Sequence, residues 1–396
     1  MDALARLLAL SQSDREALGL AHTPSEILQQ PSTWLRTFQR VLQLAPAVEE
    51  FLIRSGMRGI DPTSVSVVLL GAGTSDYIGK SLCALLQKLW RCEVQAIPST
   101  DMLTNMTEHV LPGRSYLWIS FSRSGDSSEG VAVLESALER YPEIHQLIVT
   151  CNTRGKMARS FSHDRRVFSI VLDDEVNDRG LAMTSAFTNM VIAGQALAHL
   201  GDLESYEKIL NEMALVASLV LPTMADLSER LVREGFSKIC FLGSGALKGA
   251  ATESALKVLE LTNGRVMSFS ESFLGLRHGP LSAIDQETLL VSFLSANETR
   301  RAFELDLVKE IRDKGLTGKF AIVSPTGIPD SVLLKLDKDT IVLGFEEEMP
   351  DFYRPPIDVI LGQLLGLFAS LREGLKPDTP SPQGAISRVV SHLTIY

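Results

Sequence analysis

Residues 122–128, Ser-Arg-Ser-Gly-Asp-Ser-Ser, gather the groups that bind phosphate in proteins. They follow a buried-strand pattern and precede a helical one, so hydroxyl and backbone N–H groups would face an anion at a helix N-terminus. Arg123 could add a bidentate contact. A solvated serine-rich helix cap would need only one of these hydroxyls. The loop therefore predicts a phosphate site.

Residues 71–75, Gly-Ala-Gly-Thr-Ser, form a second loop between a strand pattern and a helix pattern. Glycines allow the backbone to approach an anion, and the hydroxyls can donate hydrogen bonds. A tight strand-to-helix turn with a capping serine explains the pattern equally well. The loop is not a dinucleotide fingerprint, because the third glycine is absent at position 76, and no Walker GK[ST] pattern occurs.

Acid and base groups share one face of a helix in the second half of the chain. Glu253, Lys257 and Glu260 are spaced i, i+4 and i+7, and the residues around them are mostly Ala, Val and Leu. Charged groups on a buried helix must form ion pairs or take part in binding or catalysis. A solvent-exposed Glu–Lys pair is the alternative. We favour a functional group of side chains here.

His278 lies in the sequence Gly-Leu-Arg-His-Gly-Pro at 275–280, which predicts a loop. A histidine in such a loop can titrate near neutral pH, although its position alone does not distinguish it from a surface histidine. The four cysteines are dispersed, without a CxxC pair or a histidine at ligand spacing. We expect no metal and no cofactor.

The elements that must position these residues follow a strand–helix alternation that starts near residue 65. Short β-branched runs end in Gly or Ser and lead into helical stretches, which indicates a parallel sheet. The preceding residues favour helices, and Thr23-Pro24-Ser25-Glu26 predicts a capped helix start.

The strand pattern recurs in the second half of the chain. Residues 67–73 resemble 239–245, and residues 118–122 resemble 290–294, both at an offset of 172. Residues 147–150 match 321–324 at an offset of 174. Three strands in the same order predict two tandem, doubly wound α/β domains. The expected organisation is a helical segment at 1–49, domains at 50–202 and 235–375, a connecting helix at 203–234 and a tail at 376–396.

Composition excludes several classes of function. The chain has 396 residues, 45% hydrophobic and 22% charged, which is typical of globular domains. A formal charge of -10 disfavours nucleic acid as a partner. No uninterrupted apolar run reaches about 20 residues, so we expect no membrane span and a cytoplasmic protein.

With these motifs the chain resembles the sugar isomerase (SIS) domain proteins, which include the isomerase half of glucosamine-6-phosphate synthase. The resemblance covers about residues 50–396. Its specific elements are 71–75, 122–128, 181–188, 253–260 and 277–280. It implies tandem SIS domains that bind a sugar 6-phosphate.

The resemblance also implies roles for individual residues. Ser122, Ser124 and Ser127 would hold the phosphate, and Gly73, Thr74, Ser75 and Met183 would lie near the sugar. Glu260 would be the base, with Glu253 and Lys257 orienting it or the substrate. His278 would open the sugar ring from a neighbouring subunit, which implies a homodimer or a larger homo-oligomer.

Two residues depart from the synthase pattern. Arg123 stands where the synthase has glutamine, and Arg388 aligns with its tail lysine. Arginine stays protonated and cannot form a Schiff base under ordinary conditions. We also expect no glutaminase, because that domain needs an N-terminal cysteine and the first cysteine is Cys83.

Residues 178–180 and 377–380 look most similar to the bacterial branch described as tagatose-6-phosphate ketose/aldose isomerase and linked to galactosamine-6-phosphate deamination. We therefore predict an amino-sugar-6-phosphate deaminase/isomerase. The alternatives are a plain aldose/ketose isomerase, a deglycase acting on sugar–amino-acid adducts, and a non-catalytic phosphosugar sensor. No motif distinguishes a galacto from a gluco sugar.

Overall fold

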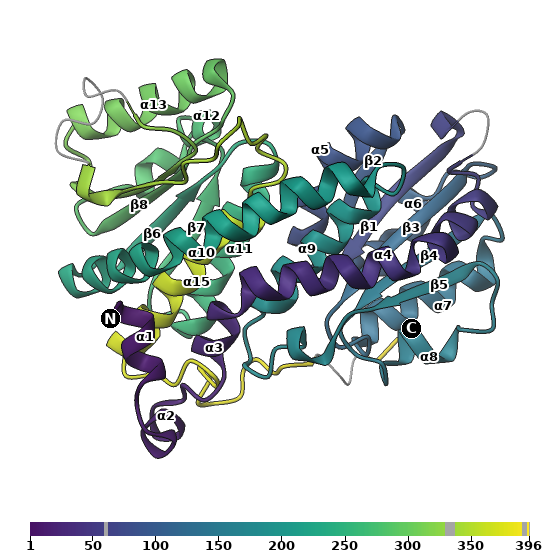
Figure 1. Ribbon diagram of the computed structural model, residues 1–396, viewed down its shortest axis with the longest axis horizontal. Coiled ribbons are helices and arrows are strands. Elements are labelled where there is room, and N and C mark those ends of the chain that lie inside the picture. The colour runs from purple at the N-terminus through teal and green to yellow at the C-terminus, as the bar shows by residue number, and fades with distance from the viewer. Residues whose placement is uncertain (59–61, 329–336, 390–393, 396) are drawn as a thin grey trace. The chain divides into compact units, whose positions relative to one another are not determined.

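The computed structural model describes residues 1–58, 62–328, 337–389 and 394–395. They fold into two compact units, each with one parallel sheet (Figure 1). Unit I comprises Ser32–Asn177, Ser185–Leu210 and Ser387–Tyr396, and unit II comprises Met1–Pro31, Asp178–Thr184 and Asn211–Ile386. The boundaries that we predict from the sequence follow the repeats along the chain, whereas packing defines these units.

Unit I contains the first predicted repeat. Its five strands are parallel in the order β2-β1-β3-β4-β5. Its elements are α4 (Gln30–Arg54), η1 (Pro62–Ser64), β1 (Val65–Gly71), α5 (Thr74–Trp90), β2 (Val94–Pro98), α6 (Ser99–His109), β3 (Ser115–Ser122), α7 (Ser128–Arg140), β4 (Ile144–Thr150), α8 (Lys156–Ser160), β5 (Val167–Val171), η2 (Asp174–Val176) and α9 (Ser185–Ala198).

Helices cover both faces of this sheet. Met102 and Met106 of α6 and Val133 of α7 pack in one cluster with Trp118 of β3. On α9, a Cβ at Gly194 would lie 2.2 Å from the Leu82 side chain, so α9 packs closely against α5. Crossover helices on both faces define a doubly wound sheet, as the sequence predicts.

Unit II contains the second repeat, and its strand order is the counterpart of the first. The order β10-β9-β8-β6-β7, all parallel, places β6, β7, β8, β9 and β10 at the positions of β1 to β5. The elements are α1 (Ala3–Leu8), α2 (Gln12–Leu18), α3 (Thr23–Leu28), β6 (Lys238–Leu242), α11 (Ala246–Leu261), β7 (Met267–Glu271), α12 (Phe273–Leu276), η3 (Pro280–Ala283), β8 (Thr288–Phe293), α13 (Glu298–Asp313), β9 (Lys319–Ser324), η4 (Asp337–Asp339), β10 (Thr340–Val342) and α15 (Pro355–Arg372). The predicted repeat of three strands is confirmed.

The core of unit II lies on both faces of its sheet. Leu307 and Ile311 of α13 pack with Phe273 of α12 and Leu290 of β8. On the other face α11 and α15 pack so closely that a Cβ at Gly362 would lie 2.3 Å from Ser254. This contact matters for the site, because α11 carries the predicted acid–base residues.

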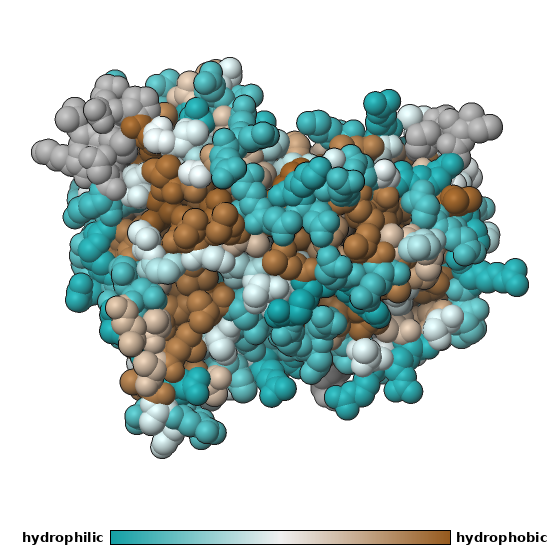
Figure 2. Space-filling model, viewed as in Figure 1, coloured by the Kyte–Doolittle hydropathy of each residue, from teal (hydrophilic) through white to brown (hydrophobic). Residues whose placement is uncertain are grey.

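Helix α10 (Leu203–Glu234) occupies the predicted connecting segment. Within the described part of the chain it is the one helix whose length and composition would suit a membrane span, a test that core helices also meet. Its side chains Leu215 and Leu219 are 57% and 67% exposed. Figure 2 shows hydrophobic patches among polar residues on the face in view.

Candidate functional site

The predicted phosphate loop of unit I connects β3 to α7. Gly125 has a positive φ of 63°, and its N–H donates to Ser122 Oγ at 3.0 Å. Asp126 N–H donates to Ser124 Oγ at 3.2 Å. Ser127 is the N-cap residue of α7. The loop thus has the predicted position at a helix N-terminus, where backbone N–H groups favour an anion.

Backbone and amide contacts from the next strand hold this loop in place. Asn152, which follows β4, donates from Nδ2 to the Ser124 carbonyl at 2.8 Å. A Cβ at Gly155 would lie 2.6 Å from that same carbonyl oxygen, so only glycine fits there. Sequence reasoning missed Asn152, although its place directly after a strand is a detectable signal.

Arg123 and Arg388 make contacts that the sequence does not predict. One Arg123 guanidinium nitrogen, Nη2, donates to the Arg388 carbonyl oxygen at 2.6 Å. The Arg388 guanidinium donates to Asn177 Oδ1 at 2.7 Å. Arg123 thereby ties the C-terminal tail to the loop, and its predicted contact with phosphate stays a prediction.

The glycines of residues 71–75 serve the strand-to-helix turn. A Cβ at Gly71 would lie 2.3 Å from the Ser75 backbone, and Gly73 is the N-cap of α5 with a φ of 57°. In unit II, Gly243 and Gly245 repeat both features, with a φ of 58° at Gly245. The turn alone therefore accounts for these glycines. Thr74 and Ser75 are buried at the start of α5.

Helix α11 of unit II brings Glu253, Lys257 and Glu260 into contact. Lys257 Nζ lies 3.1 Å from Glu253 Oε1 and 2.7 Å from Glu260 Oε2. The Lys257 and Glu253 side chains are fully buried, whereas the Glu260 side chain is 24% exposed. Glu260 is therefore the carboxylate of this group that solvent reaches.

The charge state of Lys257 follows from its neighbours. Burial by itself would lower the pKa of the Lys257 ammonium, but the two carboxylates outweigh burial, and the pKa is raised. Lys257 therefore stays protonated near neutral pH. A protonated lysine cannot serve as a base or nucleophile. The orienting role of Lys257 stays a prediction.

His278 lies exposed in the turn between α12 and η3, and its N–H donates to the Gly275 carbonyl at 2.9 Å. Gly275 and Leu276, which we predict in the loop, belong to the short helix α12 instead. In the residues that the structure describes, no group of three His, Cys, Asp or Glu side chains is arranged to hold a metal ion.

A buried carboxylate cluster in unit II involves residues that the sequence does not connect. Glu26 Oε1 accepts from the Arg179 and Gly180 N–H groups at 2.5 and 3.3 Å. The Asp178 carboxylate accepts from Thr184 N–H at 2.8 Å. Met183, the residue before Thr184, is half-buried. The predicted capped start at Thr23 is wrong, because His22 is the N-cap and the Thr23 hydroxyl donates to Asp378 at 2.7 Å.

We expect the stability of the protein to depend on the protonation of Glu26. Burial, and after it the charge of Asp178, raise the pKa of Glu26 from 4.5 to about 8, although N–H donors at Arg179 and Gly180 oppose this and Asp378 adds to it. The folded state then binds the proton more tightly than the unfolded state. This contribution to stability is fully present below about pH 4.5 and is lost as pH rises toward 8, at up to about 1.4 kcal/mol per pH unit.

Glu26→Gln should therefore flatten the fall of Tm with pH across this window, because glutamine has no proton to lose. Thermal unfolding of both proteins at intervals from pH 5 to pH 8 measures the effect. Glu16→Gln, at an exposed position, is the control and should keep the wild-type slope. A wild-type slope in Glu26→Gln would contradict the expectation.

Comparison with known proteins agrees with this fold. The SIS domain model matches residues 63–200. D-Galactosamine-6-phosphate deaminase AgaS of Escherichia coli is 34% identical over 375 residues, which are 94% of this chain and 95% of the relative. The protein of the same name from Shewanella sp. (strain ANA-3) is 32% identical, with 98% of this chain and 95% of the relative covered.

One solved structure adds a three-dimensional comparison. The crystal structure of tagatose-6-phosphate ketose/aldose isomerase from Escherichia coli has a TM-score of 0.83 and 33% identity to this chain. The match covers 92% of this chain and 97% of that one. The similarity thus extends over both repeats, beyond the 63–200 region of the domain model.

Proposed function

We propose that this chain, which belongs to the SIS domain family, is an amino-sugar-6-phosphate deaminase/isomerase that converts galactosamine 6-phosphate to tagatose 6-phosphate and ammonia. The observation that carries the proposal is the identity of 34% to a D-galactosamine-6-phosphate deaminase over 94% of the chain. The Glu253–Lys257–Glu260 group supports it, because a carboxylate reached by solvent and oriented by a buried ammonium suits proton transfer.

In the proposed mechanism the loop at 122–128 binds the phosphate and His278 assists opening of the sugar ring. Glu260 then removes the proton from C2 of the open-chain amino aldehyde, which gives an enolamine. Return of the proton to C1 leaves an imine at C2. Water adds to this imine carbon, and the C2–N bond breaks to release ammonia and the ketose. The hydrolytic step needs no imine with the protein.

Lys257 would act as a positioning residue in this reaction. Its ammonium donates to Glu260 Oε2, so one oxygen of the proposed base is held in place. Neither the protonated Lys257 nor Arg388 can form a Schiff base with the sugar. Water is therefore the proposed nucleophile in deamination, without a protein imine at either of these two positions.

A plain aldose/ketose isomerase is the second candidate, because the similar Escherichia coli structure carries that name. An isomerase would use the same base and the same phosphate loop. Ammonia release distinguishes the two functions. We expect a coupled ammonia assay to detect turnover with galactosamine 6-phosphate, with glucosamine 6-phosphate and unphosphorylated galactosamine as comparison substrates. Interconversion of neutral sugar phosphates without ammonia from any amino sugar would favour the isomerase.

The proposed partner is a second copy of the chain. His278 is exposed, as a side chain that completes a neighbouring subunit's site must be before assembly. We therefore propose a homodimer or a larger homo-oligomer, which light scattering of the purified protein measures. The proposed location is the cytoplasm, where sugar phosphates are metabolised.

Ser124→Ala should weaken substrate binding if the loop at 122–128 holds the phosphate. A hydrogen bond to a charged group is worth about 1.5–3 kcal/mol, so KM should rise about tenfold or more. Steady-state kinetics with galactosamine 6-phosphate tests this expectation. Ser162→Ala, at an exposed serine of the same unit, should leave KM unchanged. An unaltered KM in Ser124→Ala would remove the hydroxyl from the phosphate site.

A further inference from the structure

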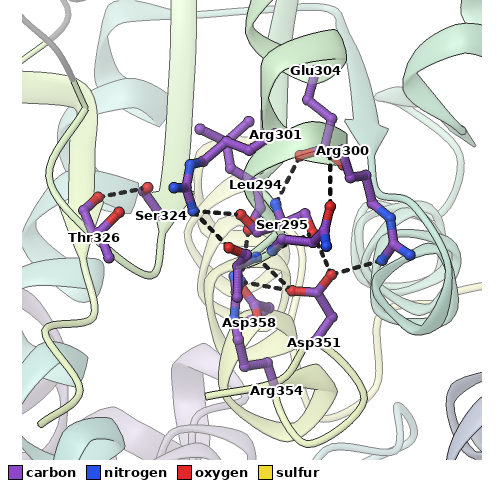
Figure 3. Close-up of polar contacts among 12 residues, drawn as sticks. Leu294, Ser295, Arg300, Arg301, Glu304, Ser324, Thr326, Asp351, Arg354 and Asp358 are labelled. Carbon is purple, nitrogen blue, oxygen red and sulfur yellow. Dashed lines mark hydrogen bonds and ion pairs between the residues drawn. The ribbon is translucent and has the colours of Figure 1, made fainter. Parts of the chain in front are cut away.

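The second repeat has its own loop at the position of the phosphate loop. Residues 294–297 follow β8 and lead into α13, with Asn297 as the N-cap residue. The repeat offset of 172 aligns Ser295 with Arg123 and Ala296 with Ser124. Figure 3 shows dashed contacts between this loop and a side chain of the protein itself, Asp351.

Three donors of this loop and its helix converge on the Asp351 carboxylate. Ala296 N–H donates to Oδ1 at 2.7 Å, and the Ser295 hydroxyl donates to Oδ2. Arg300 Nη1 donates to Oδ2 at 2.8 Å. A backbone N–H, a hydroxyl and a guanidinium at a helix N-terminus are the donors that bind oxyanions in proteins.

Buried groups hold the donors in position. Ser295 N–H donates to Glu304 Oε2 at 2.7 Å. Arg354, which is fully buried, donates to the Leu294 carbonyl at 2.6 Å and pairs with Asp358 at 2.8 Å. Arg354 Nη1 also reaches Asp351 Oδ1 at 3.5 Å. The contacts with Glu304, the Leu294 carbonyl and Asp358 do not involve Asp351, so they can hold the loop without it, which is a requirement for a preformed site.

The space beside this loop disfavours a sugar phosphate. A cavity of about 300 Å³ is bordered by Ala296 and by Pro325 and Thr326 after β9, at the carboxyl ends of the strands. Ligands of doubly wound sheets bind at that edge. Here the lining includes four carboxylates, Glu298, Glu346, Glu347 and Glu348, against one arginine, Arg301. Such a lining repels a phosphate dianion.

We propose that the second repeat contains an oxyanion site whose occupant is the carboxylate of Asp351, and that this site accepts a small free oxyanion when the carboxylate is removed. The tethered carboxylate occupies the site because its effective concentration exceeds that of free anions. The chain consequently binds sugar phosphate in one repeat only. This inference goes beyond the proposed function, because it concerns the loop after β8 and holds whatever reaction the chain catalyses.

The test is rescue of Asp351→Ala by formate, which has the size and charge of the missing carboxylate. Removing Asp351 leaves Ser295, Ala296 and Arg300 without this acceptor, so Tm should fall by about 5–15 °C. Formate at hundreds of millimolar should raise the Tm of the variant and recover a substantial part of the loss. Chloride at equal ionic strength should not, because the site needs an oxygen acceptor.

Three controls separate rescue from general salt effects. The wild type and Asp351→Asn, which keeps the volume of the side chain, should show no formate-specific rise in Tm. The third control is Asp313→Ala. Asp313 also pairs with an arginine of α13, at 2.8 Å from Arg312, but it lies at an exposed position. This variant should show no rescue. A formate response of Asp351→Ala equal to that of these controls would overturn the proposal.

A variant that does not fold in buffer alone is tested by its refolding yield. The yield of soluble Asp351→Ala should then rise with formate and stay constant with chloride. A yield that does not depend on formate up to molar concentration would overturn the proposal as well. Ammonia release is not a readout here, so failure of the proposed function and failure of this inference remain distinguishable.

Discussion

Replacing Glu260 with Gln is expected to lower kcat by a factor of about 10²–10⁴ while KM changes by no more than a few-fold. Glutamine preserves the shape of the side chain and can still contact Lys257, but it cannot accept the substrate proton. Glu260 is the member of the buried charged group that solvent reaches, with 24% of its side chain exposed. A carboxylate that only paired with Lys257 would affect stability and leave turnover within a few-fold.

The measurement combines ammonia release with incorporation of solvent deuterium at C1 or C2. Both should be lost in Glu260→Gln, because exchange and turnover need the same proton transfer. Glu234→Gln is the control, since Glu234 also pairs with a cation, Arg230 at 3.0 Å, but on the surface of α10. Exchange at the wild-type rate in Glu260→Gln would assign the base to another group, and Glu253 would be tested next.

Replacing Lys257 with Met is expected to lower the free energy of unfolding by about 3–5 kcal/mol, the usual cost of leaving a buried charge without its partner. Glu253 is fully buried, and one of its carboxylate oxygens lies 3.1 Å from Lys257 Nζ. Without the ammonium this carboxylate must be buried with an uncompensated charge or take up a proton. Turnover should also fall, because Glu260 loses the donor that orients it.

Urea unfolding measures the loss, and a second substitution identifies its cause. Lys257→Met with Glu253→Gln should recover much of the lost stability, because the uncompensated charge is gone, but should not recover activity. Lys208→Met is the control, since Lys208 pairs with Glu204 at 3.1 Å on a surface where both side chains are mostly exposed. A Lys257→Met protein as stable as this control would contradict the expectation.

The repeat and the helix spacing were sufficient to predict the architecture and the first contacts of the site. Matching strand patterns at an offset of 172 predict two tandem α/β domains, because a repeated pattern indicates a repeated structural unit. The shared strand order of the two sheets came from the structure. The spacing of Glu253, Lys257 and Glu260 predicts their contact, because residues three and four apart in a helix are neighbours. The roles of these residues stay predictions.

Contacts between distant parts of the chain required the tertiary structure. Glu26 binds the backbone at 179–180, Arg123 binds the carbonyl of Arg388, and Asp351 binds the loop after β8. A local pattern shows only that a residue suits a helix, a strand or a turn, so the Thr23–Glu26 segment resembled a simple helix cap. Whether a carboxylate meets an ammonium, a backbone N–H or another carboxylate depends on which segments pack together. By itself the sequence determined the repeated sheets and the local acid–base group on α11. Only tertiary packing decided the long-range partners, because folding rather than sequence spacing brings those residues together.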